Sequence, residues 1–182
     1  DRACRFCLTG KMGFIRNLAA DEIISQVILG RKIVQENGMP ELTNVVFMGQ
    51  GDAGRNIVEV RRAVEALVDR KRLGMSASKV TVSSVGPSPE TFMELAKLQG
   101  TLAWSLHSPN DAVRKALVPS TMHTTVELRD GLIKALKTRQ TIRTRTMMVA
   151  CTLIDGVNDS ADDARDLATF IRPMFEVAPK VA

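Results

Sequence analysis

The chain has 182 residues, 45% of them apolar and 25% charged, which is typical of one globular domain with a sizeable core. No apolar run approaches the roughly 20 residues of a membrane span and no signal-peptide pattern is found, so we expect no membrane partner and a cytoplasmic location, or an organelle stroma. A net charge of +5 suits a polyanionic partner, while the absence of tyrosine and the single Trp104 argue against an aromatic platform for stacking bases.

Strands and helices are predicted to alternate along the whole chain. Strands are predicted over 44–48, 79–83, 101–106 and 141–154, the last with Arg143 and Arg145 on one face. Helices are predicted over 20–36, after the cap Asn56, over 90–98 after the cap Ser88, and after the capping box Thr124-x-x-Glu127. A last helix is predicted over 160–171, with Ala164, Leu167, Ala168 and Ile171 pointing inward. This alternation predicts parallel βαβ units and the α/β fold class, as a section of a (β/α) barrel in one domain. Residues 179–182 resemble the start of a further strand.

A pair of cysteines, Cys4 and Cys7, lies near the start of the chain with two residues between them. Two thiolates at this spacing can hold one iron or zinc ion. The spacing alone fits a zinc knuckle, a thioredoxin-like redox site and an iron–sulfur loop equally well.

The segment Gly49–Gly54 fits the dinucleotide-binding pattern G-x-G-x-x-G, and it follows a predicted strand and precedes a predicted helix. That function also needs an acidic residue at the end of the second strand, which here reads Val82-Ser83-Ser84-Val85. A glycine turn with Asp52 as a capping carboxylate is the simpler structural alternative.

Polar residues follow each predicted strand where the strand ends. They are Gly49 to Asp52, Ser83 and Ser84, Ser105-Leu106-His107, and Asp155 to Asn158. In (β/α) barrels ligands bind at this end of the sheet, where hydroxyls and an imidazole can bind a ribose, a carboxylate or an adenine edge. A strand-end serine and a loop-capping histidine are the structural alternatives.

Two further groups have simpler explanations than a binding site. Cys151 lies in an apolar strand and is expected to be a packed core thiol. A basic set could bind phosphates, or could be solvated helix ends. Its members are Arg70, Lys71, Arg72, Lys134, Lys137, Arg139, Arg143 and Arg145.

The cysteine loop and its surroundings resemble the radical S-adenosylmethionine (SAM) enzymes, whose cluster pattern is Cys-x-x-x-Cys-x-x-Cys. The tail Gly13-Phe14-Ile15-Arg16-Asn17-Leu18, the triplet Ser105-Leu106-His107 and the loop Gly156–Asp159 narrow the resemblance to the radical methyltransferases that modify adenine carbon 2 or 8 of RNA. The resemblance covers nearly the whole chain and implies a truncated radical SAM barrel.

This resemblance implies specific site residues. Cys4 and Cys7 would be two of three thiolate ligands of a [4Fe–4S] cluster, and Gly51, Asp52, Ser83, Ser105, Leu106 and His107 would line SAM. Asp52 stands for a glutamate, and Ala53 for a proline, of the family's Gly-x-Gly-Glu-Pro loop, so the loop is less rigid and the carboxylate one methylene shorter.

The family's chemistry sets further expectations. One electron from the cluster cleaves the SAM sulfonium to a 5′-deoxyadenosyl radical, and the methyl group reaches an adenine of ribosomal RNA, possibly transfer RNA, with flavodoxin or ferredoxin as electron donor. The family's first cluster cysteine would fall just before Asp1 and its methyl-carrying cysteine after Ala182. We therefore expect a fragment lacking its first and last strands and its catalytic cysteines, with no activity alone.

Two other functions stay open at this point. One is a radical SAM enzyme with a different acceptor, because the cysteines that define a methyltransferase are not in the chain. The other is a non-catalytic domain in which Cys4 and Cys7 hold a structural zinc ion with ligands from another chain.

Overall fold

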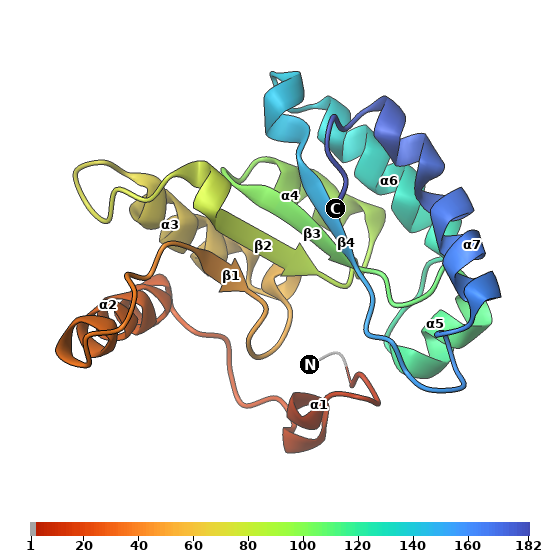
Figure 1. Ribbon diagram of the computed structural model, residues 1–182, viewed down its shortest axis with the longest axis horizontal. Coiled ribbons are helices and arrows are strands. Elements are labelled where there is room, and N and C mark those ends of the chain that lie inside the picture. The colour runs from red at the N-terminus through yellow and green to blue at the C-terminus, as the bar shows by residue number, and fades with distance from the viewer. Residues whose placement is uncertain (1–2) are drawn as a thin grey trace.

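The computed structural model describes residues 3–182, apart from the side chain of Arg143, and contains a four-stranded parallel sheet. Its strands lie side by side in chain order as β1 (Val45–Phe47), β2 (Val80–Ser84), β3 (Thr101–Ser105) and β4 (Met147–Ala150), as Figure 1 shows. The helices are α1 (Leu8–Met12), α2 (Ala20–Glu36), α3 (Ile57–Val68), α4 (Pro89–Ala96), α5 (Asp111–Leu117), α6 (Thr125–Lys137) and α7 (Ala161–Ile171). Short 3-10 helices are η1 (Ala53–Arg55), η2 (Ala77–Lys79), η3 (Ile142–Arg145) and η4 (Arg172–Glu176).

The strand order decides between the two parallel folds that the sequence allowed. Each strand pairs with the next one in the chain, with Val45 opposite Val80, Thr81 opposite Thr101, and Leu102 opposite Met147. A doubly wound dinucleotide-binding sheet reverses its order at a switch point, and this sheet does not. The partial (β/α) barrel is therefore confirmed, and the dinucleotide-binding alternative is wrong.

The two faces of the sheet differ in character because successive strand residues point to opposite sides. Val80, Val82, Leu102 and Trp104 point toward the helices and are at most 2% exposed. The opposite, inner face carries small or polar side chains at the positions in between: Thr81, Ser83, Thr101, Ala103 and Ser105. The inner face can therefore receive a polar ligand while the outer face forms the core.

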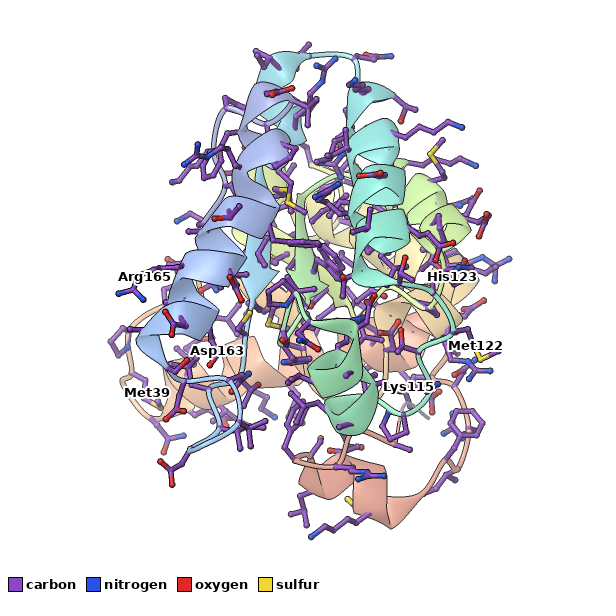
Figure 2. All side chains as sticks on the ribbon, turned by 90° about the vertical axis from the view of Figure 1, so that its right-hand side faces the viewer. Met39, Lys115, Met122, His123, Asp163 and Arg165 are labelled. Atoms are coloured by element: carbon purple, nitrogen blue, oxygen red, sulfur yellow. The ribbon has the colours of Figure 1, made fainter. Side chains whose placement is uncertain are left out.

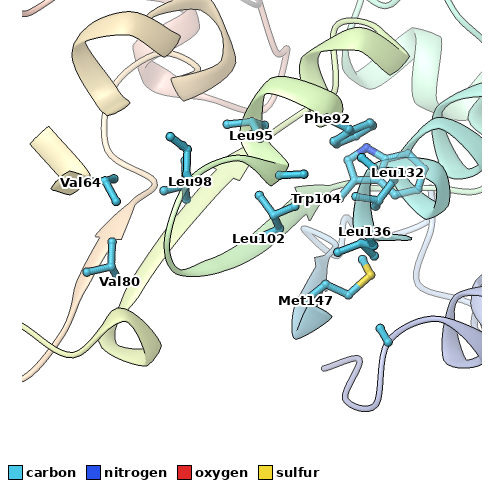
Figure 3. Close-up of a cluster of buried hydrophobic side chains, with 14 of the residues drawn as sticks. Val64, Val80, Phe92, Leu95, Leu98, Leu102, Trp104, Leu132, Leu136 and Met147 are labelled. Atoms are coloured by element: carbon cyan, nitrogen blue, oxygen red, sulfur yellow. The ribbon is translucent and has the colours of Figure 1, made fainter. Parts of the chain in front are cut away.

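The core lies between the sheet and the helices α3, α4 and α6 (Figure 3). Trp104 is fully buried and meets Phe92 of α4 edge-on, with ring centroids 5.7 Å apart. A Cβ atom on Gly131 of α6 would lie 2.6 Å from Pro89 Cβ, so glycine is what lets α6 approach α4 so closely.

Several predicted helix ends are confirmed with their caps. α2 spans the predicted residues, and Ser88 Oγ accepts a hydrogen bond from Thr91 N at 3.4 Å. In the capping box before α6, Thr124 Oγ1 accepts from Glu127 N at 3.2 Å while Glu127 Oε2 accepts from Thr124 N at 2.8 Å. Each cap is completed within one turn of chain, which is why the sequence reveals it.

Other predictions of local structure are wrong. Asn56 precedes α3, but its side chain donates to Leu18 O at 2.8 Å instead of capping the helix. Residues 142–145 form the 3-10 helix η3 rather than strand, because Arg139 binds Thr144 O at 2.5 Å and Thr144 Oγ1 donates to Thr141 O at 2.7 Å. The predicted orientation of Arg143 lies outside the described residues.

The last two elements were predicted only in part. In α7, Leu167 and Ile171 are half-buried as expected, but Ala164 and Ala168 are exposed. Residues 180–182 do pair with β4, through Met147 N to Lys180 O at 3.2 Å and Ala182 N to Met147 O at 3.2 Å. Over residues 3–182, none of the helices is both long and apolar enough to cross a membrane.

Candidate functional site

The cysteine loop lies beyond the carboxyl ends of the strands, where Figure 1 shows α1 below the arrowheads. Arg5 N donates to Leu117 O at 3.0 Å, which ties the loop to the end of α5. The Phe6 ring meets the His107 ring edge-on at a centroid distance of 4.8 Å. These contacts bring Cys4 and Cys7 to the same end of the sheet as the predicted site residues.

The two thiols lie in different environments. Hydrogen bonding from the Gly10 amide lowers the pKa of Cys7, so the loop stabilises a thiolate there. Burial raises the pKa of Cys4, and the nearby Cys7 and Asp52 raise it further, while the positive charge of Arg114 opposes them. Both cysteines are free.

The loop that carries these two thiols is tight, and their binding of an iron–sulfur cluster stays a prediction. The loop folds back on itself through Cys7 N to Cys4 O at 3.1 Å, and a Cβ atom on Gly10 would come within 2.8 Å of Cys4 O. The tight loop therefore requires glycine at position 10. Among residues 3–182 no group of three or more His, Cys, Asp or Glu side chains is placed to hold a metal ion.

Asp52 is buried and bound to the neighbouring strand. Its carboxylate accepts hydrogen bonds from Gly54 N at 2.8 Å, Ser84 Oγ at 2.9 Å and Val85 N at 2.7 Å, and the residue is 8% exposed. It therefore joins the loop after β1 to the end of β2, which is more than the capping role that the sequence suggested. Its role toward a cofactor ammonium group remains a prediction.

A cavity of about 450 Å³ opens beside Asp52. Its walls come from residues 12–18, from α2, from the exposed edge of β1 and from the loop that contains Gly51, which has a φ of +78°. This volume lies within the range of small-molecule sites. Gly51 and Asp52 line the cavity, whereas Ser83, Ser105 and His107 lie outside its lining.

The two predicted serines meet on the inner face of the sheet, where Ser83 Oγ and Ser105 Oγ are 3.0 Å apart. Leu106 points the other way, with its side chain fully buried in the core. Its backbone groups are also used, because Leu106 N donates to Ala150 O at 2.9 Å and its carbonyl accepts from Arg114. The structure thus brings Ser83 and Ser105 together and separates the Leu106 side chain from them.

His107 has an unusual backbone conformation. Its φ is +67°, and the only other non-glycine residue with positive φ in the described chain is Ala3. Holding a non-glycine residue there costs roughly 1–3 kcal/mol, and such strain is concentrated at functional sites. Burial, with a smaller effect from Arg114, lowers the pKa of His107 to about 4, so the imidazole is neutral near pH 7.

The sequence did not indicate Arg114 as a residue of this region, and it placed Asn158 at a strand end without a specific role. Arg114 of α5 is fully buried and donates to the carbonyl oxygens of Val85, Ser105 and Leu106. Asn158, predicted only as part of a loop, is buried and donates to His107 O at 2.6 Å. Recognition of Asn110 as a cap, which accepts from Ala112 N and Val113 N, would have revealed α5 and hence Arg114.

Two members of the predicted basic set bind backbone carbonyl groups of the fold. Arg139 is 7% exposed and donates to Gly100 O at 2.8 Å and Leu98 O at 3.1 Å, at the amino end of β3 and away from the site. Both alternatives for this residue, a phosphate contact and a solvated helix end, are wrong because its guanidinium is buried and bound to backbone carbonyl groups. Arg145 donates to Lys137 O at 3.4 Å. The side chain of Arg143 lies outside the described residues.

A crystal structure of a radical SAM methyltransferase from Sphaerobacter thermophilus matches with a TM-score of 0.83 and 35% identity, over 93% of this chain and 49% of that one. No protein-family model matches. The fold is therefore a partial radical SAM core, similar to about half of that methyltransferase.

Several curated RNA methyltransferases are also similar to this chain. The probable dual-specificity RNA methyltransferase RlmN of Chlorobaculum tepidum is 36% identical over 93% of this chain and 45% of its own length. The RlmN of Microcystis aeruginosa is 40% identical, and ribosomal RNA large subunit methyltransferase N of Nitrosopumilus maritimus 38%, each over 93% of this chain and 48% and 47% of their own length. The chain is thus similar to these RNA methyltransferases over 93% of its own length and spans about half of theirs.

Proposed function

We propose that this chain is the core of an enzyme that transfers a methyl group from SAM to an adenine carbon of ribosomal RNA, and possibly of transfer RNA. A [4Fe–4S] cluster with bound SAM would supply one-electron cleavage of the sulfonium to a 5′-deoxyadenosyl radical. Cys4 and Cys7 would hold the cluster with a third thiolate. Gly51, Asp52, Ser83, Ser105 and His107 would bind SAM.

The observation that supports this proposal most strongly is the contact between Phe6 and His107. It lies between the two cysteines on one side and the strand carboxyl ends on the other, with ring centroids 4.8 Å apart. A cluster held by the cysteines would therefore lie next to the inner face that carries Ser83 and Ser105. The names of the relatives support RNA as the methyl acceptor.

The proposal implies two partners and a compartment. Each sulfonium cleavage consumes one electron, which a low-potential carrier such as flavodoxin or ferredoxin would supply. The net charge of +5 favours RNA. Three free cysteines favour a reducing compartment, so we place the protein in the cytoplasm or an organelle stroma.

Iron content tests the cluster directly. A chain carrying a cysteine one position before Asp1, reconstituted without oxygen, should bind about four irons and be brown. Cys4→Ser and Cys7→Ser should each lose most of the iron, whereas Cys151→Ser should keep it because Cys151 lies half-buried beside the core. Equal iron in all three variants, or a colourless protein that binds zinc, would rule out the proposed cluster.

Product analysis separates the proposed reaction from the remaining alternatives. The iron-loaded protein is incubated with SAM, dithionite and unmodified ribosomal RNA, and both products are followed by mass spectrometry. 5′-Deoxyadenosine together with methylated adenine supports the proposal. Because the family's methyl-carrying cysteine is expected after Ala182, the protein used here also carries that cysteine, and 5′-deoxyadenosine without methylated adenine then indicates a different acceptor.

A further inference from the structure

Asn158 lies in the loop between β4 and α7, yet its side chain is only 6% exposed. Its amide nitrogen donates to His107 O at 2.6 Å and to Thr152 O at 3.0 Å, and its amide oxygen accepts from Ile154 N at 2.8 Å. The amide nitrogen and the amide oxygen of Asn158 therefore both bind backbone groups, in two segments of the chain. The side chain fastens the exit of β4 to the residue that follows β3.

The same contacts determine how the His107 ring is held. Thr152 N donates to His107 Nδ1 at 3.2 Å, so Nδ1 is the unprotonated ring nitrogen and the proton of the neutral imidazole lies on Nε2. Asn158 donates hydrogen bonds to the backbone carbonyl groups of His107 and Thr152, the two residues that make this contact. Within the described residues Nε2 makes no hydrogen bond, so it is available to a ligand.

The backbone of His107 needs such an anchor. Its φ of +67° is a conformation that a non-glycine residue keeps only when its surroundings enforce it. The bond from Asn158 to His107 O acts on the carbonyl of this strained residue, and Phe6 covers one edge of the ring. Together these contacts leave the imidazole one orientation, with Nε2–H as its free donor.

We propose that Asn158 is a positioning residue that holds His107 as a fixed, neutral Nε2–H donor toward an acceptor atom of SAM. The proposal rests on the proposed function, because it takes SAM as the ligand at the strand ends. Asn158 itself does not touch the ligand. It acts through the backbone of His107 and through the Thr152 amide.

The test uses nitrogen NMR of the imidazole rings, which needs neither cluster nor SAM. The chain has two histidines, and His123, labelled in Figure 2 near the outside of the molecule, is the internal reference. In the wild type, His107 should show only the Nε2–H tautomer. In Asn158→Ala, it should exchange between tautomers and titrate closer to 6.5, while His123 stays unchanged.

Asp159→Asn is the matched control. Asp159 is the next residue, and its carboxylate accepts from Gly156 N at 3.0 Å within the same loop, at an exposed position. This variant should leave the His107 tautomer as in the wild type. On the iron-loaded protein, calorimetry should show SAM binding at least fivefold weaker in Asn158→Ala and unchanged in Asp159→Asn.

Three results would overturn the inference. One is an Nδ1–H tautomer in the wild type, which can be measured even if Asn158→Ala does not fold. Another is an unchanged His107 ring in a folded Asn158→Ala protein. The third is a changed ring with unchanged SAM affinity. If the wild type itself binds no SAM, the proposed function fails instead, and the tautomer result still stands as a separate measurement.

Discussion

Buried polar side chains at the carboxyl end of this sheet bind backbone groups of neighbouring strands. Arg114 is the strongest example, because its guanidinium donates to carbonyl groups at the ends of both β2 and β3 and lies 5.7 Å from the centre of the Trp104 ring. Burial lowers its pKa only to about 10, so it stays charged near pH 7. Arg114 therefore places a positive charge near the half-buried Cys4, where it partly offsets the negative charge of Asp52.

Asp52 combines structural contacts with a predicted ligand contact. Asp52→Asn keeps the volume of the side chain but removes the charge that would bind the SAM ammonium group. Its amide nitrogen also cannot accept the hydrogen bond from Gly54 N or Val85 N, so the free energy of unfolding is measured beside the SAM affinity. We expect SAM binding to weaken by roughly 1.5–3 kcal/mol, measured by calorimetry on iron-loaded protein.

Ser84→Ala provides the control for that measurement, because it removes a hydrogen bond to Asp52 of 2.9 Å and leaves the carboxylate in place. It should lower the free energy of unfolding by about 1 kcal/mol without weakening SAM binding. An equal loss of affinity in both variants would mean that Asp52 acts only through the fold.

At the scale of elements, the amino end of the sheet is held together by Arg139. Its guanidinium binds the carbonyl oxygens of Ala96, Leu98, Gly100 and Thr144, and so joins the end of α4, the turn before β3, and η3 to the end of α6. Burial lowers its pKa to about 10, so the bonds are charge-assisted near pH 7. The contact explains why η3 replaces the predicted strand.

Replacing Arg139 should therefore destabilise several elements together. Arg139→Gln leaves buried carbonyl groups without donors, and we expect the free energy of unfolding to fall by about 3 kcal/mol in urea denaturation. Lys137→Gln, at an exposed position two residues earlier, should change it by less than about 0.5 kcal/mol. Similar losses in the two variants would contradict the role given to Arg139.

At the scale of the whole molecule, His107 makes stability depend on pH. A histidine titrates near 6.5 in the unfolded chain, whereas burial lowers the pKa of His107 to about 4 in the folded protein. Between these values the unfolded chain binds more protons, so stability is present above pH 6.5 and is lost as the pH falls toward 4. From pH 7 to pH 5 the free energy of unfolding should drop by about 2 kcal/mol.

Two histidine variants test whether His107 causes this loss of stability. His107→Asn, which tolerates a positive φ, should remove most of the pH dependence between pH 7 and pH 5 in urea unfolding. His123→Gln should retain it, since His123 lies half-exposed in the loop before α6. A pH dependence that persists in His107→Asn would show that other groups cause it.

The sequence alone determined the features that are completed within a few residues. The capping box Thr124–Glu127 and the Ser88 cap are local patterns, so their consequences did not depend on the rest of the fold. The alternation of strands and helices predicted the parallel sheet, because each strand and each helix can be recognised from its own residues. It also placed Ser83 and Ser105 at strand ends, where the structure brings their hydroxyls to 3.0 Å.

Only the tertiary structure decided which distant groups share a hydrogen bond. Asn56 binds Leu18 O, Arg139 binds Leu98 O, and Asn158 binds His107 O, across 38, 41 and 51 residues of chain. A buried polar side chain bonds to whatever backbone group packing places beside it, and no local pattern reports that neighbour. Long-range packing therefore determined that Arg139 is buried and joins several elements, that residues 142–145 form a 3-10 helix instead of a strand, and that Asn158 binds His107.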